Sequence, residues 1–222
     1  VLIYVDDIII TGSDDAHISL VISVLMEKFK MKDLGPLRYF LGVEVDRHND
    51  SLTLSQHKYI CDILHATCME DCKPLNNPCI LNHKLSAKVG LPYHYPTLYR
   101  RIVGMMQYLT FTRPDIAYVI NQTSQFMHAP TDCHMESVKR ILRYLKGTVG
   151  DGLKYTSDKR YPSCHFLPTY SDADWAGDPD ERRSVSGYCV YIGHNVVTWS
   201  NKKQKTVARS SIEAEYRAMA AG

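Results

Sequence analysis

The stretch VLIYVDDIIITGSDD (residues 1–15) places two adjacent aspartates, Asp6 and Asp7, between two short apolar runs. Short runs of this kind, rich in β-branched residues, are typical of buried strands. Because only two residues separate the runs, the sequence predicts a β-hairpin that turns on Asp6-Asp7. Two-residue hairpin turns favour Asn-Gly or Asp-Gly, and neighbouring carboxylates repel each other. An unfavourable acidic turn indicates a bound cation, and two carboxylates suit Mg²⁺; the alternative is an ordinary solvated turn.

The residues after this hairpin predict a helix, a second hairpin and another helix. Apolar residues spaced for one helical face occupy residues 18–29, which predicts a helix with one buried stripe. Residues 39–56 then alternate between apolar and polar side chains around a turn at Asn49-Asp50, the pattern of a hairpin. The stretch HKYICDILHATC (residues 57–68) carries its apolar side chains on one side and is predicted to be helical.

The middle of the chain predicts a linker followed by helices. Prolines without a regular period mark the linker, which we assign to residues 81–98. Residues 99–127 and 134–147 are predicted to be helical, with Gly147 as the C-cap of the second helix. One side of that second helix is basic, which fits either a solvated face or a surface that follows a phosphate backbone. Its basic residues are Lys139, Arg140, Arg143 and Lys146.

A second group of carboxylates lies in residues 165–222. A short strand is predicted to end at Ser171 and to be followed by Asp172 and Asp174. Two further strands then lead to a helix that starts near Ser210. Carboxylates from a strand and from a helix are typical of sites that hold two metals about 4 Å apart and hydrolyse a phosphodiester. Asp172 is the favoured strand ligand, and Asp174 is the less favoured choice.

The helical ligand of this second site is not decided by periodicity. Glu213 and Glu215 flank opposite edges of the apolar stripe on the predicted helix. Acidic residues also occur at strand and helix starts without any catalytic role. Both glutamates therefore remain candidates at this point.

Several long blocks together resemble the Pol polyprotein of copia-type long-terminal-repeat retrotransposons. The blocks are YVDD (4–7), LGPLRYFLG (34–42), YRRIVGMMQYLTFTRPDIAY (99–118), YSDADWAGDPDERRSVSGY (170–188) and WSNKKQKTVARSSIEAEYRA (199–218). The resemblance covers essentially the whole chain. It implies an α+β fold with a partial polymerase palm and thumb built from antiparallel hairpins and helices, a helical connection, and a truncated ribonuclease H-like α/β unit. The implied divisions are 1–80 for the reverse transcriptase part, 81–98 for the linker, 99–160 for the connection and 165–222 for the ribonuclease H-like part.

The resemblance also assigns roles to individual residues. The tetrad YVDD is similar to the YxDD hairpin of reverse transcriptases, where Asp6 and Asp7 would be catalytic metal ligands. Leu41 and Gly42 would lie in the hairpin that holds the primer end. A Glu-x-x-Ala helix pattern in the family favours Glu215 as the ligand beside Asp172. The implied cofactor is Mg²⁺ or Mn²⁺, and the implied partners are an RNA template, a DNA primer and an RNA–DNA hybrid.

Each implied metal site is only half present, with Asp6 and Asp7 in one and Asp172 and Glu215 in the other. Two carboxylates do not hold two divalent cations against their hydration. We therefore expect a fragment whose cations bind only in the complete protein. The expected function is RNA-directed DNA polymerase with ribonuclease H activity in the complete polyprotein. The alternative is a catalytically dead transposon remnant that at most binds nucleic acid.

The composition is that of ordinary globular material, with 45% hydrophobic residues, 23% charged residues and a net charge of +2. This total charge is too small to indicate nucleic acid by itself. No apolar run reaches the roughly twenty residues of a membrane span, so no membrane partner is expected. The seven cysteines form no CxxC pair, which favours reduced thiols in an intracellular protein.

Overall fold

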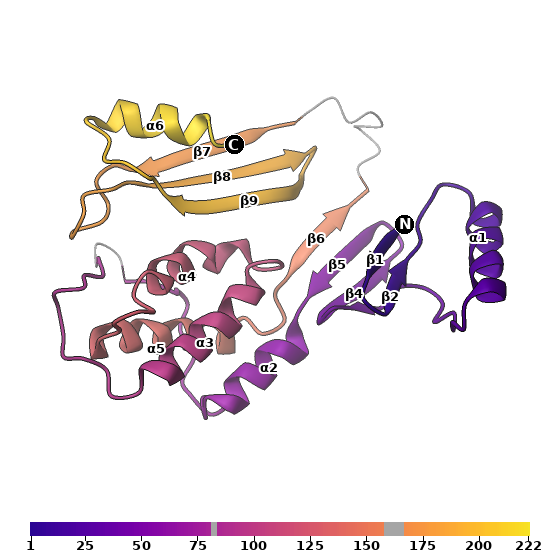
Figure 1. The fold of residues 1–222 in the computed structure, drawn as a ribbon, viewed down its shortest axis with the longest axis horizontal. Coiled ribbons are helices and arrows are strands. Elements are labelled where there is room, and N and C mark those ends of the chain that lie inside the picture. Colours follow the sequence, from indigo (N-terminus) through magenta and orange to yellow (C-terminus); the bar gives the residue numbers. More distant parts are fainter. Residues whose placement is uncertain (81–83, 158–166) are drawn as a thin grey trace.

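The computed structural model describes residues 1–80, 84–157 and 167–222. Within these ranges the chain is a mixed α and β structure whose strands form three antiparallel sheets, consistent with the predicted α+β class. Figure 1 shows a helical unit, a sheet covered by helix α6, and an N-terminal hairpin with helix α1 at the far end. None of the helices in the described ranges has the length and apolar character needed to cross a membrane.

The predicted N-terminal hairpin is confirmed, but its turn lies one residue earlier than expected. Strand β1 (Leu2–Tyr4) pairs with β2 (Asp7–Ile9), and Tyr4 stands opposite Asp7. The two turn residues are therefore Val5 and Asp6, and Asp7 is already part of a strand. Val5 has a φ of 48°, the positive value that tight hairpin turns need at their first position and that a β-branched residue rarely adopts.

Helix α1 (Asp15–Lys28) is confirmed, and the side chain of Asp14 caps it by accepting a hydrogen bond from the Ala16 amide at 2.9 Å. Its predicted buried stripe is wrong, because none of its side chains is buried. Phe29, at the end of the stripe, is 58% exposed. Figure 1 shows the physical reason: α1 stands apart from the sheets and the other helices, so nothing described covers its apolar side.

The second hairpin is confirmed and belongs to a larger sheet. The turn at Asn49-Asp50 is where it was predicted, since the residues on either side of it pair with each other. Strand β6 was not predicted, and it joins this sheet from far along the chain. Gly152 precedes β6 because a Cβ there would lie 2.2 Å from the carbonyl oxygen of Leu54. The sheet has the order β3 (Tyr39–Phe40), β4 (Val43–His48), β5 (Ser51–Ser55) and β6 (Leu153–Thr156).

The helical unit contains α2 (His57–Ala66), α3 (Pro96–Leu109), α4 (Ala117–Ser124) and α5 (Asp132–Gly147). The stretch predicted as helical over residues 99–127 is broken after Leu109, and a 3₁₀ turn at Pro114–Ile116 precedes α4. Pro114 has no backbone N–H to continue the helical ladder, which explains the break. Gly147 is the last helical residue, with no positive φ, and the C-cap is Thr148, so the predicted C-cap is wrong.

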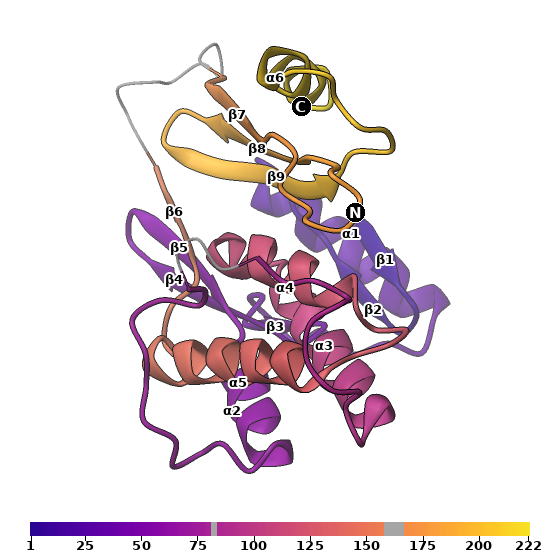
Figure 2. The same cartoon turned by 90° about the vertical axis from the view of Figure 1, so that its left-hand side faces the viewer.

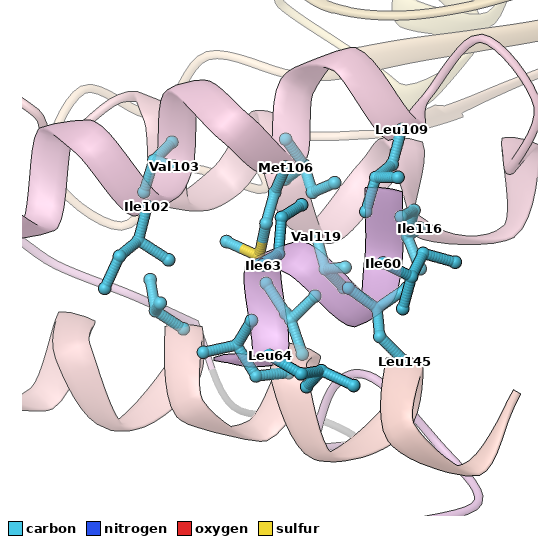
Figure 3. Close-up of a cluster of buried hydrophobic side chains, with 14 of the residues drawn as sticks. Ile60, Ile63, Leu64, Ile102, Val103, Met106, Leu109, Ile116, Val119 and Leu145 are labelled. Carbon is cyan, nitrogen blue, oxygen red and sulfur yellow. The ribbon is translucent and has the colours of Figure 1, made fainter. Parts of the chain in front are cut away.

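The hydrophobic core lies between these four helices (Figure 3). The apolar stripe of α5 is buried as its spacing predicts. Helix α2 contributes Ile60, Ile63 and Leu64, all at most 3% exposed. Arg113 lies at the edge of this core with only 1% of its surface exposed. The core thereby holds one charged residue that only its hydrogen-bond partners can compensate.

The last described unit is a three-stranded sheet with one helix, as predicted. Its elements are β7 (Thr169–Asp174), β8 (Val185–Ile192), β9 (Asn195–Lys203) and α6 (Ser211–Met219), and the strand order is β7-β8-β9. Strand β7 runs on through Asp172 and Asp174, beyond its predicted end at Ser171. Figures 1 and 2 show α6 over one face of this sheet and α4 on the other side.

Candidate functional site

Asp6 and Asp7 lie at the exposed tip of the first hairpin. Asp6 is the second turn residue, and Asp7 opens strand β2. Neither carboxylate has a hydrogen bond or ion pair with another residue in the described ranges. Both are therefore available to a ligand from outside this part of the molecule.

The chemistry of these donors fits a hard divalent cation, because Mg²⁺ and Mn²⁺ prefer carboxylate oxygens. The number of donors is smaller than such a site needs. Within residues 1–80, 84–157 and 167–222, no three His, Cys, Asp or Glu side chains are grouped so that they can hold a metal ion. The two carboxylates of the hairpin are therefore fewer donors than a cation site requires.

Leu41 and Gly42 form the two-residue turn between β3 and β4, with Phe40 opposite Val43. Their φ values are 48° and 78°, so both residues occupy the left-handed region that this kind of hairpin turn requires. Gly42 adopts this conformation freely, whereas Leu41 is strained. Tyr108 on α3 donates its hydroxyl hydrogen to the carbonyl oxygen of Leu41. The turn is therefore attached to the helical unit.

Two other tyrosines lie beside Tyr108 and this turn. The Tyr59 ring packs against Tyr108, with centroids 5.4 Å apart, and the Tyr39 hydroxyl lies 3.9 Å from the position that a Cβ on Gly42 would occupy. Burial raises the pKa of Tyr108, and the charges of Tyr39 and Tyr4 raise that pKa further. Tyr4 ends the strand that leads to Asp6. The sequence does not reveal Tyr108, because 67 residues separate it from Leu41 and no local pattern marks the contact.

The four basic residues of α5 do not act as one face. The Nε of Arg143 donates to the carbonyl oxygen of Lys73 at 2.7 Å, and Arg140 donates to the side-chain oxygen of Asn77. Both arginines are half-buried. Lys139 and Lys146 are exposed. The arginines therefore fasten the segment after α2 to α5, and the two lysines remain free to meet a phosphate backbone.

We expect the Lys139→Gln, Lys146→Gln double variant to bind an RNA–DNA hybrid with a shallower salt dependence. Each lost phosphate contact lowers the slope of log K against log salt by about 0.9, so the slope should fall by roughly 2. The measurement is fluorescence anisotropy over a salt series, with Lys28→Gln, Lys30→Gln at the end of α1 and just beyond it as the matched control. An unchanged slope would mean that the two lysines are only solvated.

Asp172 and Glu215 start from opposite faces of the C-terminal sheet. Asp174 accepts hydrogen bonds from the Val185 amide and, at 3.5 Å, from the Tyr118 hydroxyl, so its face looks toward α4. Asp172 shares that face because side chains alternate along a strand. Gln204 donates to Ser186 and to the Ala214 carbonyl, which places α6 on the other face. In the described sheet β7 is an edge strand. A ligand could therefore contact both carboxylates only by reaching around that edge.

The alternative ligands at this second site have structural partners. Glu213 accepts from the Arg209 amide at 2.7 Å and pairs with Arg217 at 2.6 Å. The hydrogen bond from Arg209 and the nearby Arg217 charge lower the pKa of Glu213. Asp174 is half-buried, which raises its pKa despite the bond from Val185. The pattern Ser210-x-x-Glu213, a capping box, is the signal in the sequence that marks Glu213 as a helix-start residue.

By contrast, Asp172 and Glu215 have no hydrogen bond or ion pair with another described residue. Asp172 is exposed, and Glu215 is half-buried. A ligand can therefore bind these two carboxylates without breaking a hydrogen bond or ion pair between described residues.

The C-terminal sheet is seated on the helical unit by specific hydrogen bonds. The Trp199 indole donates to the Thr110 carbonyl at 3.0 Å, and Asn121 donates to the Asn201 carbonyl at 2.9 Å. Asp180 accepts from Ser86 at 2.7 Å and from the Ala87 amide at 2.6 Å. These last contacts lie within the segment interpreted as a linker, so part of that segment is packed against the sheet.

Comparisons with known proteins relate nearly the whole chain to Pol polyproteins of transposons. Residues 1–81 match the model of a family described as "Reverse transcriptase (RNA-dependent DNA polymerase)". The chain is 50% identical over 219 residues to the "Retrovirus-related Pol polyprotein from transposon RE1" of Arabidopsis thaliana, covering 99% of this chain and 15% of that polyprotein.

Two shorter relatives match over most of their own length. The chain is 46% identical to an uncharacterized mitochondrial protein of Arabidopsis thaliana, covering 99% of this chain and 89% of that protein. It is 33% identical to a putative transposon Ty5-1 protein of Saccharomyces cerevisiae, covering 97% of this chain and 70% of that protein. No solved structure matches the chain.

Proposed function

The chain belongs to the copia-type family of retrovirus-related Pol polyproteins, and we propose that it supplies the later part of the reverse transcriptase and the opening part of ribonuclease H within such a polyprotein. Residues 1–80 are assigned to the polymerase palm and thumb, 99–160 to the connection and 165–222 to the ribonuclease H-like unit. Residues 81–98 join the first two parts. The substrates of the complete protein would be an RNA template, a DNA primer and their hybrid.

One observation carries the polymerase assignment: Asp6 and Asp7 stand unpaired at a hairpin tip inside the region that matches reverse transcriptases. Their oxygens suit Mg²⁺ or Mn²⁺, which when bound supply the positive charge for in-line attack at a phosphate. The Leu41-Gly42 turn would position the primer end. Primer extension by the complete polyprotein tests the assignment, because Asp6→Asn removes a donor charge and leaves the size of the side chain unchanged.

The ribonuclease H assignment rests on Asp172 and Glu215, the two carboxylates of this unit that are free of structural contacts. Asp172 holds its oxygens outward from β7, and Glu215 presents its own from the middle of α6. Both are hard donors for the cations that the family is expected to use. The described residues add no third donor to them, so the complete site would draw on other parts of the polyprotein.

Cleavage of an RNA–DNA hybrid by the complete polyprotein should fall about a hundred- to a thousandfold in Asp172→Asn and in Glu215→Gln, because each removes a charged group of the site. Glu213→Gln should retain cleavage and slightly lower the free energy of unfolding, because it weakens the ion pair with Arg217. A cleavage assay and a urea titration on the same preparations separate these effects. Equal loss of cleavage in Glu213→Gln and Glu215→Gln would contradict the assignment.

A further inference from the structure

We infer that Tyr108 is a positioning residue for the primer end, because its hydroxyl and ring hold the Leu41-Gly42 turn in its shape. This inference rests on the proposed function of that turn. It adds a residue from the connection region to a site whose other residues all lie in the reverse transcriptase match.

The turn needs an outside contact to keep its shape. Leu41 and Gly42 both have positive φ, and for Leu41 this conformation is unfavourable. The Leu41 carbonyl accepts the hydroxyl hydrogen of Tyr108. The ring of the same tyrosine lies 3.4 Å from the position that a Cβ on Gly42 would occupy. One side chain therefore contacts both turn residues.

Tyr108 is itself fixed in place. Its ring packs edge-on against Tyr59, with centroids 5.4 Å apart, and against Phe111, with centroids 5.6 Å apart. Tyr59 is held in turn by a 3.2 Å hydrogen bond from its hydroxyl to the Met105 carbonyl on α3. Swinging the Tyr108 hydroxyl away from Leu41 thus requires both ring contacts to break.

The first hairpin also influences Tyr108. Tyr4 ends strand β1 just before the Val5-Asp6 turn, and its charge raises the pKa of Tyr108. The Tyr108 hydroxyl itself bonds to the Leu41-Gly42 turn. Its removal should change where the primer end lies relative to Asp6 more than how tightly the duplex binds.

The test uses the 222-residue chain and an RNA–DNA primer–template whose last primer nucleotide is 4-thiothymidine. Irradiation should cross-link the primer end of wild type to the peptide that contains Leu41 and Gly42, as mapped by mass spectrometry. Tyr108→Phe keeps the ring and loses the donor, so the yield per bound duplex should fall about fivefold with unchanged duplex affinity. Tyr95→Phe, which removes an exposed hydroxyl at the start of the same helix and away from the turn, is the matched control.

The outcomes separate this inference from the proposed function. Cross-linking at the turn in wild type with an equal yield per bound duplex in Tyr108→Phe would overturn the inference and leave the function standing. Wild-type cross-links that miss the turn would overturn the primer role of the turn and the inference with it. A loss of thermal stability in Tyr108→Phe without a change in yield would show a purely structural role and would also overturn the inference.

Discussion

Replacing Arg113 by methionine is expected to lower the free energy of unfolding by about 3 kcal/mol, near the lower end for breaking a buried charged pair. Arg113 is 1% exposed and makes a two-point contact with Asp115, at 3.0 and 2.7 Å. It also donates to the carbonyl and the hydroxyl of Thr148, at 2.9 and 2.8 Å. The variant leaves these acceptors without their donor. Because Asp115 is partly exposed, its hydration by water offsets part of the lost free energy.

The Arg113–Asp115 pair also makes part of the free energy of unfolding depend on pH. Burial alone would raise the pKa of Asp115, but the bonds from Arg113 and Tyr144 outweigh it and hold the pKa below the ordinary 3.8. A carboxyl with a lowered folded pKa stabilises the fold above its ordinary pKa, and this stability is lost as the pH falls below it. The methionine variant should lack that acid-dependent step.

Urea titrations of both proteins at neutral and acidic pH check this expectation. The matched control is Arg101→Met, because Arg101 is an exposed arginine of the same helical unit. Its effect should stay within about 0.5 kcal/mol. Equal losses in the two variants would show that Arg113 contributes no more than a surface residue does.

In the complete polyprotein, Asp6→Asn or Asp7→Asn should reduce primer extension about a hundred- to a thousandfold, the cost of removing one well-placed electrostatic group. The reason is that each amide lacks the charge which holds a divalent cation at the hairpin tip. Both side chains are exposed and without partners in the described ranges, so the free energy of unfolding should change by less than about 0.5 kcal/mol.

A control for these variants lies in the next hairpin. Asp50 is also an exposed aspartate in a two-residue turn, at Asn49-Asp50. Asp50→Asn should leave primer extension unchanged, since no assigned site includes it. A comparable loss in Asp50→Asn would mean that the acidic tip has no special role.

Local patterns in the sequence predicted the elements whose packing is also local. The apolar spacing of α5 correctly predicted its buried stripe, and the meander of β7 to β9 followed from short apolar runs. The stripe of α1 was predicted with the same rule, but none of its side chains is fully buried. Periodicity tells which side of a helix is apolar, but it does not tell what lies against that side.

The errors and omissions share one physical cause, which is contact between distant residues. Strand β6 pairs with β5 across about a hundred residues, and Tyr108 reaches Leu41 across 67. No local rule encodes either pairing. The N-terminal turn was misplaced by one residue because only Asp6-Asp7 separates the two apolar runs, whereas the pairing of Tyr4 with Asp7 sets the turn at Val5-Asp6.

The candidate-site residues show the same difference between local patterns and contacts of distant residues. Asp6, Asp7 and Asp172 were chosen from local motifs and Glu215 from the family resemblance, and the structure places all four carboxylates without structural partners in the described ranges. The sequence left Glu213 open, although its spacing from Ser210 marks a capping box. It also treated the basic side of α5 as uniform, because only the fold shows Arg140 and Arg143 bound to the segment after α2.

The most direct test of the account is magnesium-dependent primer extension, measured in parallel for the 222-residue chain and for the complete polyprotein. The account predicts extension by the polyprotein and its loss in Asp6→Asn. It predicts no extension by the chain alone, whose described residues bring no three donors together for a metal. Extension by the purified chain that disappears in its own Asp6→Asn variant would contradict the claim that the chain holds only a share of the site.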